Sequence, residues 1–232
     1  MRVYLIRHGE SEGNKAGVLQ GRQDWPLTDR GREQAAIAGR FLAEDLGNHS
    51  ATHLFASPLS RAAETAAIIR GLLPHPIPEP VHHDSLREIH CGALEGLPLT
   101  EIPERFPGFA WPRTDWLDLQ HYGGQSREEF FGEVYTWLEA LALPWEEPQD
   151  GAIVFVSHAA TLRALVAFFL DQRDFHHLHY HFGNACLLRL GMRRSDQGAR
   201  PALEFMLTND QMALVNAGRR VAAATSAPAG DS

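Results

Sequence analysis

The sequence predicts an α/β fold, a three-layer α/β/α sandwich with a mostly parallel central sheet. Short apolar runs alternate along the chain with longer segments that begin at helix-capping residues. One run, Ala152–Val156, is apolar throughout and rich in β-branched residues, which is typical of a strand covered on both faces. With 232 residues, 44% of them hydrophobic, the chain can bury a sizeable core. Repeated strand–loop–helix units favour this fold, in which ligands bind outside the carboxyl ends of the strands.

The N-terminal half is predicted to contain two strand–helix units. The first helix has Thr28 as its N-cap and stops at Gly47. The second opens with the hydroxyl of Ser57 before Pro58, a residue favoured at the first helical position. In order, the predicted elements are a strand at 2–6, a helix ending at 46, a strand at 53–56 and a helix ending at about 72.

The C-terminal half continues the same alternation. A capping box of Ser126 and Glu129 starts its first helix, because each side chain can bond to the backbone of the other residue. In order, the predicted elements are a helix from there to about 143, a strand at 152–156, a helix from 160 to about 170, and strands at 186–190 and 203–207.

Between about Leu94 and Gln125 the alternation is interrupted by an insertion. Prolines and aromatic residues predict an irregular excursion there, with prolines at 98, 103, 107 and 112, tryptophans at 111 and 116, and phenylalanines at 106 and 109. The simpler alternative is a surface loop that its aromatic side chains stabilise. We favour a lid over an active site, because long loops in compact domains are often functional. We therefore expect one domain over 1–215 with a lid insertion, and a disordered tail over 216–232.

The composition excludes several classes of protein. A net charge of −8 argues against a broad nucleic-acid surface, although an acidic protein can still hold a basic pocket. Cys91 and Cys186 do not form a disulfide framework and suit a reducing cytoplasm. The apolar runs are too short to span a bilayer, and Arg2 and Arg7 bracket only four apolar residues, too few for a secretory signal. We expect a cytoplasmic protein with no membrane and no nucleic-acid partner; the sequence does not give its oligomeric state.

The residues that can perform chemistry follow the predicted strands. His8 comes directly after the first strand, between an arginine whose fixed fork of donors suits phosphoryl oxygens and a glycine that permits close approach. Neutral imidazole is a competent nucleophile near pH 7. Arg61 lies in the first turn of a helix, Glu88 lies just before the insertion, and His158 ends the strand at 152–156. In an open α/β sheet such positions converge in one crevice.

In these residues and their order, the chain resembles the histidine phosphatase superfamily, also called the phosphoglycerate-mutase-like fold. The resemblance extends to about Asn209 and rests on a set of motifs rather than on one short match. The motifs are Arg7-His8-Gly9-Glu10-Ser11, Asn14, Gln20-Gly21, Asp24-Trp25-Pro26-Leu27-Thr28, Ser57-Pro58-Leu59-Ser60-Arg61-Ala62, Glu64-Thr65-Ala66, Leu86-Arg87-Glu88-Ile89, Glu95-Gly96-Leu97 and Val156-Ser157-His158.

The resemblance implies a mechanism and a set of site residues. His8 would attack phosphorus in line and become a phosphohistidine, which divides one difficult displacement into two easier ones. Glu88 would protonate the leaving alcohol and then take a proton from the attacking water. The phosphoryl oxygens would be held by Arg7, Arg61 and His158, with help from Asn14. Gln20, Gly21 and Ala159 are implied as further substrate-binding residues.

The same resemblance implies a small phosphorylated metabolite as substrate and no metal or other cofactor, because cationic side chains neutralise the phosphate. The histidines at 176, 177, 179 and 181 could suggest a metal site, but no cysteine or carboxylate stands at a recognised ligand spacing from them. We expect them to form a loop near the pocket instead.

The resemblance leaves three functions open, and we favour a phosphatase. The glycerate mutases of the family have a tyrosine where Cys91 stands, a lysine near Leu99 and a pair of arginines in the insertion, where this chain has Arg105 and Arg113 singly. The segment Gly183–Leu187 is more similar to the phosphatase branch. An apolar lid with tryptophans favours a substrate whose organic part is uncharged. The other alternative is a phosphate-binding regulatory module with low turnover.

The chain departs from the family pattern at two positions. Ala159 follows the second catalytic histidine, where glycine is usual, and its methyl group could narrow access to the phosphate. Gln125 stands where glutamate is common before Ser126, which could affect how the insertion is anchored.

Overall fold

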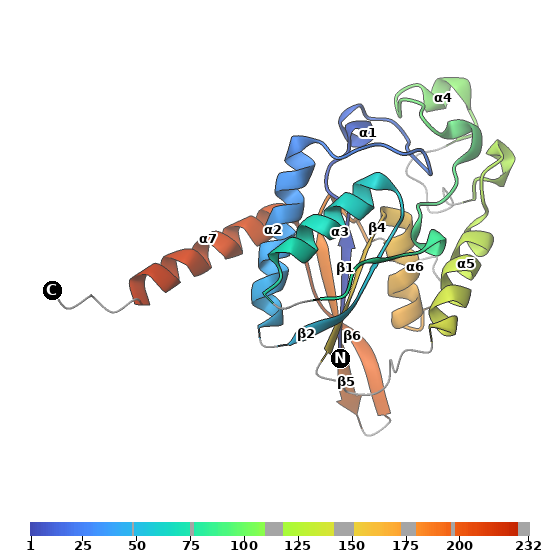
Figure 1. Cartoon of the computed structure of the whole chain (residues 1–232). Helices are drawn as coiled ribbons and strands as arrows, with labels where there is room; N and C mark the ends of the chain where they lie inside the picture. The colour runs from blue at the N-terminus through green and yellow to red at the C-terminus, as the bar shows by residue number, and fades with distance from the viewer. Residues whose placement is uncertain are drawn as a thin grey trace.

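The chain forms a six-stranded sheet with helices on both faces, as the sequence predicts (Figure 1). The computed structural model describes residues 1–47, 49–74, 77–109, 118–141, 151–172, 180–195 and 198–226. Within them the strand order is β3-β2-β4-β1-β5-β6. The strands are β1 (Arg2–Arg7), β2 (Ser50–Ala56), β3 (Val81–His82), β4 (Gly151–Ser157), β5 (Leu187–Ser195) and β6 (Gly198–Leu207).

Parallel pairing brings the ends of the central strands to one edge of the sheet. β1 pairs with β4 from Arg2 opposite Ala152 to Arg7 opposite Ser157, and β2 pairs parallel to β4 and β3. β5 is antiparallel to both β1 and β6, so it is the one described strand that runs in the opposite direction. The residues that follow β1, β2 and β4 therefore meet at the carboxyl edge.

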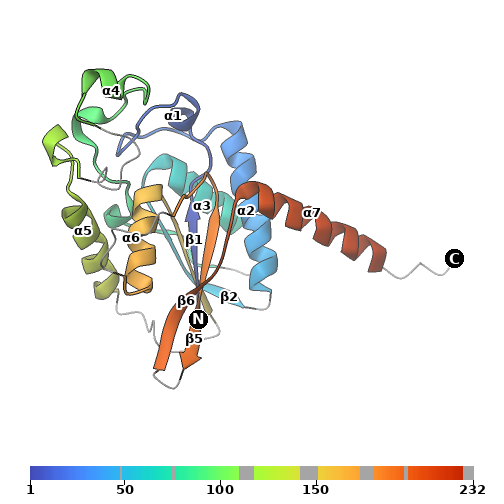
Figure 2. The ribbon, with the colours of Figure 1, turned by 180° about the vertical axis from the view of Figure 1, so that it is seen from behind.

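Side chains alternate between the two faces of β1, and each face has its own core. Val3 and Leu5 pack with α5 (Arg127–Ala140) and α6 (Ala159–Phe169). Tyr4 and Ile6 pack on the other face, which is covered by the helices α2 (Asp29–Leu46), α3 (Ser60–Leu72) and α7 (Asn209–Ser226). Figure 2 shows the two groups of helices on opposite sides of the sheet. This period-two burial fixes the register of the strand.

Two of the predicted helix caps are confirmed, and one is wrong. Thr28 accepts a hydrogen bond from the backbone N–H of Gly31 at 2.9 Å, and the Ser126–Glu129 capping box is complete. Ser57 is not a helix cap, because α3 begins at Ser60 and its N-cap, Leu59, has no side-chain cap. The Ser57 hydroxyl accepts from the backbone N–H of Leu59 at 3.2 Å and is used in the site described below.

The insertion lies above the carboxyl edge of the sheet, near the short helix α1 (Glu12–Lys15) (Figure 1). Its described part contributes Ile102, Phe109 and Leu119 to the core on the α5–α6 side. The short helices around and within it are η1 (Asp84–Leu86), η2 (Gly92–Leu94), α4 (Ile102–Arg105) and η3 (Gln120–Tyr122). Residues 110–117, including Arg113 and both tryptophans of the insertion, lie outside the described residues.

The prediction of a disordered tail from residue 216 is wrong for 216–226, because α7 continues through Ser226. Alanine, the best helix former, recurs in its last two turns. Its first half is anchored on α2, where Met212 is buried and the Asn216 amide donates to the carbonyl of Ile37 at 3.1 Å. Residues 227–232 lie outside the described part of the chain. None of the described helices has the length and hydropathy needed to cross a membrane.

Candidate active site

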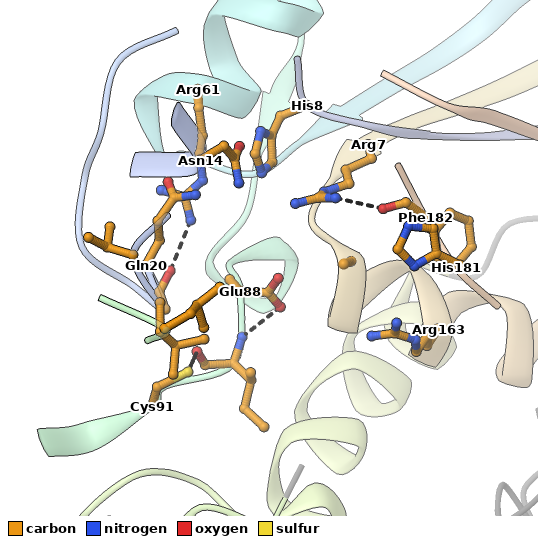
Figure 3. Close-up of a pocket in the computed structure, with 16 residues that line it drawn as sticks. Arg7, His8, Asn14, Gln20, Arg61, Glu88, Cys91, Arg163, His181 and Phe182 are labelled. Carbon is orange, nitrogen blue, oxygen red and sulfur yellow. Dashed lines mark hydrogen bonds between the residues drawn. The ribbon is translucent and has the colours of Figure 1, made fainter. Parts of the chain in front are cut away.

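A cavity of about 310 Å³ opens at the carboxyl edge of the sheet, where the sequence predicts the site. Eight of the nine predicted site residues line it: Arg7, His8, Asn14, Gln20, Gly21, Arg61, Glu88 and Ala159 (Figure 3). The ninth, His158, is fully buried directly behind His8, with 5.1 Å between the ring centroids. The predicted convergence of these residues is therefore what the structure shows.

The backbone fixes the ring of His8 and its tautomer. The backbone N–H of His8 donates to the carbonyl of Ser157 at 3.0 Å, which ties the end of β1 to β4. Its Nδ1 lies 2.7 Å from the carbonyl oxygen of Gly9. Because a carbonyl oxygen only accepts, Nδ1 is assigned the proton, and Nε2 keeps its lone pair. The ring thus presents an unprotonated nitrogen to the cavity that it lines.

Burial keeps His8 neutral. Its side chain is 2% exposed, and this desolvation lowers the pKa of His8 well below 6.5, with further lowering by the charges of Arg7 and Arg61. Only the hydrogen bond to Gly9 acts in the other direction. A neutral imidazole is the form that can attack phosphorus.

Arg7 and Arg61 place two guanidinium groups in the same cavity. Arg7 donates from Nη1 to the carbonyl of Phe182 at 2.6 Å, and its Nε is buried with no partner. Arg61 donates to the carbonyls of Gln23 and Gly21 at 2.8 and 2.9 Å, and its Nε is also buried with no partner. Burial lowers the pKa of Arg61 to about 10, so the group stays charged at neutral pH. A guanidinium has five donors, so both side chains keep donors for an anion.

Ser57 holds the ring of His158. The hydroxyl of Ser57 lies 2.8 Å from Nε2 of His158, while Nδ1 is buried with no partner. We assign the hydroxyl hydrogen to Nε2, which leaves a proton on Nδ1. Burial lowers the pKa of His158 well below 6.5, and the charge of Arg61 lowers it further. A buried polar atom without a partner is costly, so this N–H is a candidate donor to a ligand bound beside His8, whose ring centroid is 5.1 Å away.

The carboxylate of Glu88 is held at the start of α6. Its two oxygens lie 3.2 and 3.4 Å from the backbone N–H of Ala160, and Oε1 also accepts from the backbone N–H of Ile89 at 3.0 Å. Helix N-termini favour such an acceptor because their first N–H groups have no partner within the helix. Glu88 therefore faces the cavity with a fixed carboxyl group, as an acid–base residue requires.

Ser11 orients the two predicted amide side chains. Its hydroxyl lies 3.0 Å from Oδ1 of Asn14 and 2.8 Å from Oε1 of Gln20. The backbone N–H of Ser11 and the amide of Asn184 donate to Oδ1 of Asn14, at 3.2 and 3.0 Å. Because Asn14 already has these donors, we assign the one hydroxyl hydrogen of Ser11 to Oε1 of Gln20. Both amide oxygens are then acceptors, so the NH₂ groups of both side chains remain as donors.

The predicted glycine and alanine positions follow from backbone geometry. Gly21 has φ of +50°, and a Cβ there would overlap the carboxylate of Glu95. Its carbonyl, which accepts from Arg61, can take this position only because glycine tolerates such a backbone. Ala159 is the first residue of α6, a position with ordinary helical geometry, so its methyl group adds to the cavity wall without strain.

The structure adds wall residues that the sequence did not mark as candidates: Val18, Leu19, Ile89, Arg163 and Phe182. Cys91 and Leu99, the positions compared with the mutases, also line the cavity, and so does His181, which was expected in a loop near the pocket. Arg163 donates from Nε to the carbonyl of Tyr180 at 3.1 Å. One sequence signal could have found it, since it is the only charged residue in the mostly apolar α6. Ser57 gave no such signal, because its contact with His158 joins residues 101 positions apart.

The described residues contain no group of three or more metal-ligating side chains. Of the four clustered histidines, His181 lines the cavity, whereas those at 176, 177 and 179 lie outside the described residues.

The site combines a neutral buried histidine, two guanidinium groups and a fixed carboxyl group. This combination is typical of enzymes that transfer phosphoryl groups. Residues 3–200 match the family described as histidine phosphatase superfamily (branch 1). The chain belongs to this superfamily, as the sequence motifs predict.

Relatives of the chain include both phosphatases and a mutase. It is 32% identical over 198 residues to a probable phosphoglycerate mutase of Salmonella paratyphi C, covering 84% of this chain and 86% of that protein. A mycobacterial glucosyl-3-phosphoglycerate phosphatase solved with VO3 has a TM-score of 0.70 and 27% identity, covering 88% of this chain and 96% of that one. The alpha-ribazole phosphatase from Shigella flexneri has a TM-score of 0.69 and 25% identity, covering 88% and 95%.

Proposed function

We propose that the protein is a metal-independent phosphomonoesterase that acts through a phosphohistidine at His8 on a small organic phosphate. The observation that carries this proposal is the state of His8. Its Nδ1 is bonded to the carbonyl of Gly9, its ring is neutral, and its other nitrogen is available at a cavity wall beside Arg7 and Arg61.

In the first step, Nε2 of His8 forms a bond to phosphorus while the bond from phosphorus to the ester oxygen breaks. Arg7, Arg61 and Nδ1 of His158 have unused donors for the three equatorial oxygens, whose charge must be held through the transition state. Glu88 gives its proton to the departing alkoxide, which leaves as an alcohol. The positive side chains perform the neutralisation for which other phosphoryl-transfer enzymes use a metal ion.

In the second step, water replaces the alcohol. Glu88, now a carboxylate, takes a proton from the water as its oxygen bonds to phosphorus and the bond from phosphorus to Nε2 breaks. Inorganic phosphate is released, and both His8 and Glu88 return to their starting protonation states. The same carboxyl group therefore serves as acid and then as base.

Apart from Arg163 and His181, the remaining cavity wall is apolar, which supports a substrate whose organic part is uncharged where it contacts that wall. Val18, Leu19 and Leu99 contribute apolar side chains to the cavity wall. The buried thiol of Cys91 and the ring of Phe182 lie on opposite sides of the cavity (Figure 3). Burial raises the pKa of Cys91 well above 9.0, so its sulfur remains a neutral thiol. Such a surface binds a small organic group mainly by excluding water from it.

A mutase is the second candidate, because the Salmonella relative has that name. A mutase must hold a second anionic group and exclude water from the phosphohistidine. The described cavity wall has a thiol at Cys91 and an aliphatic side chain at Leu99, where the resemblance places the tyrosine and lysine of mutases. Hydrolysis is therefore the function that we favour.

The test is phosphate release from para-nitrophenyl phosphate in the presence of a chelator, with His8→Ala as the variant. We expect turnover by the wild type, loss of at least about 100-fold in the variant, and acid-labile phosphate on the wild-type protein alone. Undiminished turnover by His8→Ala would exclude the mechanism. Transfer of phosphate between the hydroxyl groups of phosphoglycerate, without net release, would favour the mutase, and binding without turnover would favour a regulatory module.

A further inference from the structure

The backbone that carries Glu88 is held by side chains from three other parts of the chain. Residues 88–91 lie between two short helices and form no regular structure of their own. Each of three successive carbonyls just before and at Glu88 accepts a side-chain hydrogen bond. The donors are Ser157 Oγ to Leu86 at 2.6 Å, Thr161 Oγ1 to Arg87 at 2.7 Å, and Arg22 Nε to Glu88 at 3.1 Å.

Thr161 holds this backbone by a hydrogen bond, and it lies in the same turn of α6 that holds the Glu88 carboxylate. The N–H of Ala160 contacts the carboxylate, and the next residue, Thr161, donates its hydroxyl to the carbonyl of Arg87. Thr161 is fully buried and does not line the cavity. Its hydroxyl therefore connects α6 to the Glu88 segment without a direct contact to substrate.

Arg22 acts from the opposite side and is itself fixed at its far end. While Nε donates to the carbonyl of Glu88, Nη2 lies 3.0 Å from Oε1 of Gln125 and 3.4 Å from Glu133. The same oxygen of Gln125 accepts from the backbone N–H of His90 at 3.1 Å. Arg22 and Gln125 thus bond to the backbone on both sides of Ile89, and neither lines the cavity.

From these contacts we infer that Thr161 and Arg22 are positioning residues that set where the Glu88 carboxyl group stands. Proton transfer needs donor and acceptor within about 2.6–3.2 Å, and a misplacement of about 1 Å can cost a large part of the rate. Loss of either tether lets the segment shift while the nucleophile and the arginines stay in place. The inference rests on the proposed function, in which Glu88 is the acid and then the base.

Leaving-group chemistry separates a positioning effect from general damage. A nitrophenolate departs without a proton, so P–O cleavage of para-nitrophenyl phosphate needs little help from Glu88. A benzyl alkoxide must be protonated as it leaves, so cleavage of benzyl phosphate needs Glu88 fully. Hydrolysis of the phosphohistidine needs Glu88 with either substrate, so a misplaced carboxyl group makes the phosphoenzyme accumulate.

The experiment compares Thr161→Val, which removes the hydroxyl, with Thr161→Ser, which keeps it. Arg22→Met removes the second tether. For Thr161→Val we expect kcat/KM to fall about 10-fold more with benzyl phosphate than with para-nitrophenyl phosphate. A misplaced acid should lose only part of the rate enhancement of about 10²- to 10⁴-fold that a general acid contributes. A burst of nitrophenol equal to the enzyme concentration should appear. Thr161→Ser should restore kcat/KM with benzyl phosphate and abolish the burst. Arg22→Met should give the same two changes as Thr161→Val.

Two control variants remove similar groups far from the segment. Thr52→Val deletes a hydroxyl that donates to the carbonyl of Ala152 at 3.1 Å, and Arg32→Met deletes an exposed cation paired with Glu64. Neither variant should change the ratio of kcat/KM with benzyl phosphate to kcat/KM with para-nitrophenyl phosphate.

Two outcomes would overturn the inference. One is an equal fall of kcat/KM with both substrates and no burst, and the other is no fall of kcat/KM with either substrate. If Thr161→Val does not fold, Arg22→Met gives the decisive ratio, because Arg22 is partly exposed. Failure of the proposed function is a different result, since it would show as undiminished turnover in His8→Ala.

Discussion

The two buried active-site histidines should make the stability of the protein fall steeply below pH 6.5. Their folded-state pKa values lie well below the ordinary value of 6.5, mainly because of burial. Below pH 6.5 the unfolded chain therefore binds two protons that the folded chain does not. Stability must rise with pH in this window and is fully present above 6.5. The loss continues downward until each folded-state pKa is reached.

The magnitude follows from linkage. Each group that binds a proton in the unfolded chain but not in the folded chain changes the unfolding free energy by up to about 1.4 kcal/mol per pH unit below its unfolded pKa of about 6.5. His8 and His158 together should therefore give a slope of up to about 2.7 kcal/mol per pH unit in this window. Against a typical domain stability of about 5–15 kcal/mol, this effect is large enough to measure.

The assay is urea unfolding at pH 6.5 and 5.0, in buffers free of phosphate, for the wild type and His8→Asn. The Asn amide can keep a hydrogen bond to the carbonyl of Gly9 but does not titrate. We expect the difference in unfolding free energy between the two pH values to shrink in the variant, by up to about 1.4 kcal/mol per pH unit. Thr52→Val, which loses one hydrogen bond elsewhere, should lower stability but keep the wild-type difference. Equal differences in His8→Asn and wild type would refute the argument.

Three further predictions concern activity and packing. When kcat/KM is measured against pH, its decrease on the acid side should have a midpoint below pH 6.5, because the pKa of His8 is lowered. A midpoint at or above pH 6.5 would contradict a neutral His8 in the free enzyme. Ser57→Ala should lower kcat/KM by about 5- to 100-fold in a folded protein, since a buried hydrogen bond to His158 is lost; unchanged kinetics would show that Ser57 does not orient the ring. Gly9→Ala should destabilise the protein by about 1–3 kcal/mol in thermal or urea unfolding, because its Cβ would overlap the backbone of Gly31; wild-type stability would mean that the two segments can move apart.

The sequence predicted those features that local patterns determine. Thr28 and Ser126 were identified as caps because capping depends on residues within one turn. The sheet, and the positions of His8, Arg61, Glu88 and His158 near its strand ends, followed from apolar runs and from what ends each run. Asn14, Gln20, Gly21 and Ala159 were expected in the cavity only because of the family resemblance. The exact strand limits did not follow from the apolar runs, since β2 begins at Ser50 rather than His53 and β3 has only two residues, with no pattern to detect.

What the sequence could not give depends on contacts between distant segments. Ser57 precedes a proline and therefore resembles a helix cap, but its hydroxyl is needed by His158 from the neighbouring strand. The sequence did not predict α7 at all, and its segment beyond residue 215 was expected to be disordered because small residues predict disorder when no partner is known. In the fold, α2 supplies that partner through Ile37 and the helix continues.

In the proposed mechanism, the arrangement of the site resolves a conflict between two requirements of phosphoryl transfer. The phosphate needs positive charge around it, whereas the nucleophile must be an uncharged imidazole. Arg7 and Arg61 meet both requirements, because the charges that attract phosphoryl oxygens also lower the pKa of His8. Burial strengthens each effect, since it weakens solvent screening of the arginines and disfavours an imidazolium. Glu88, whose carboxyl group is held at the start of α6, is left as the group that we propose exchanges the proton. Nucleophile activation and phosphate binding are therefore consequences of the same buried charges.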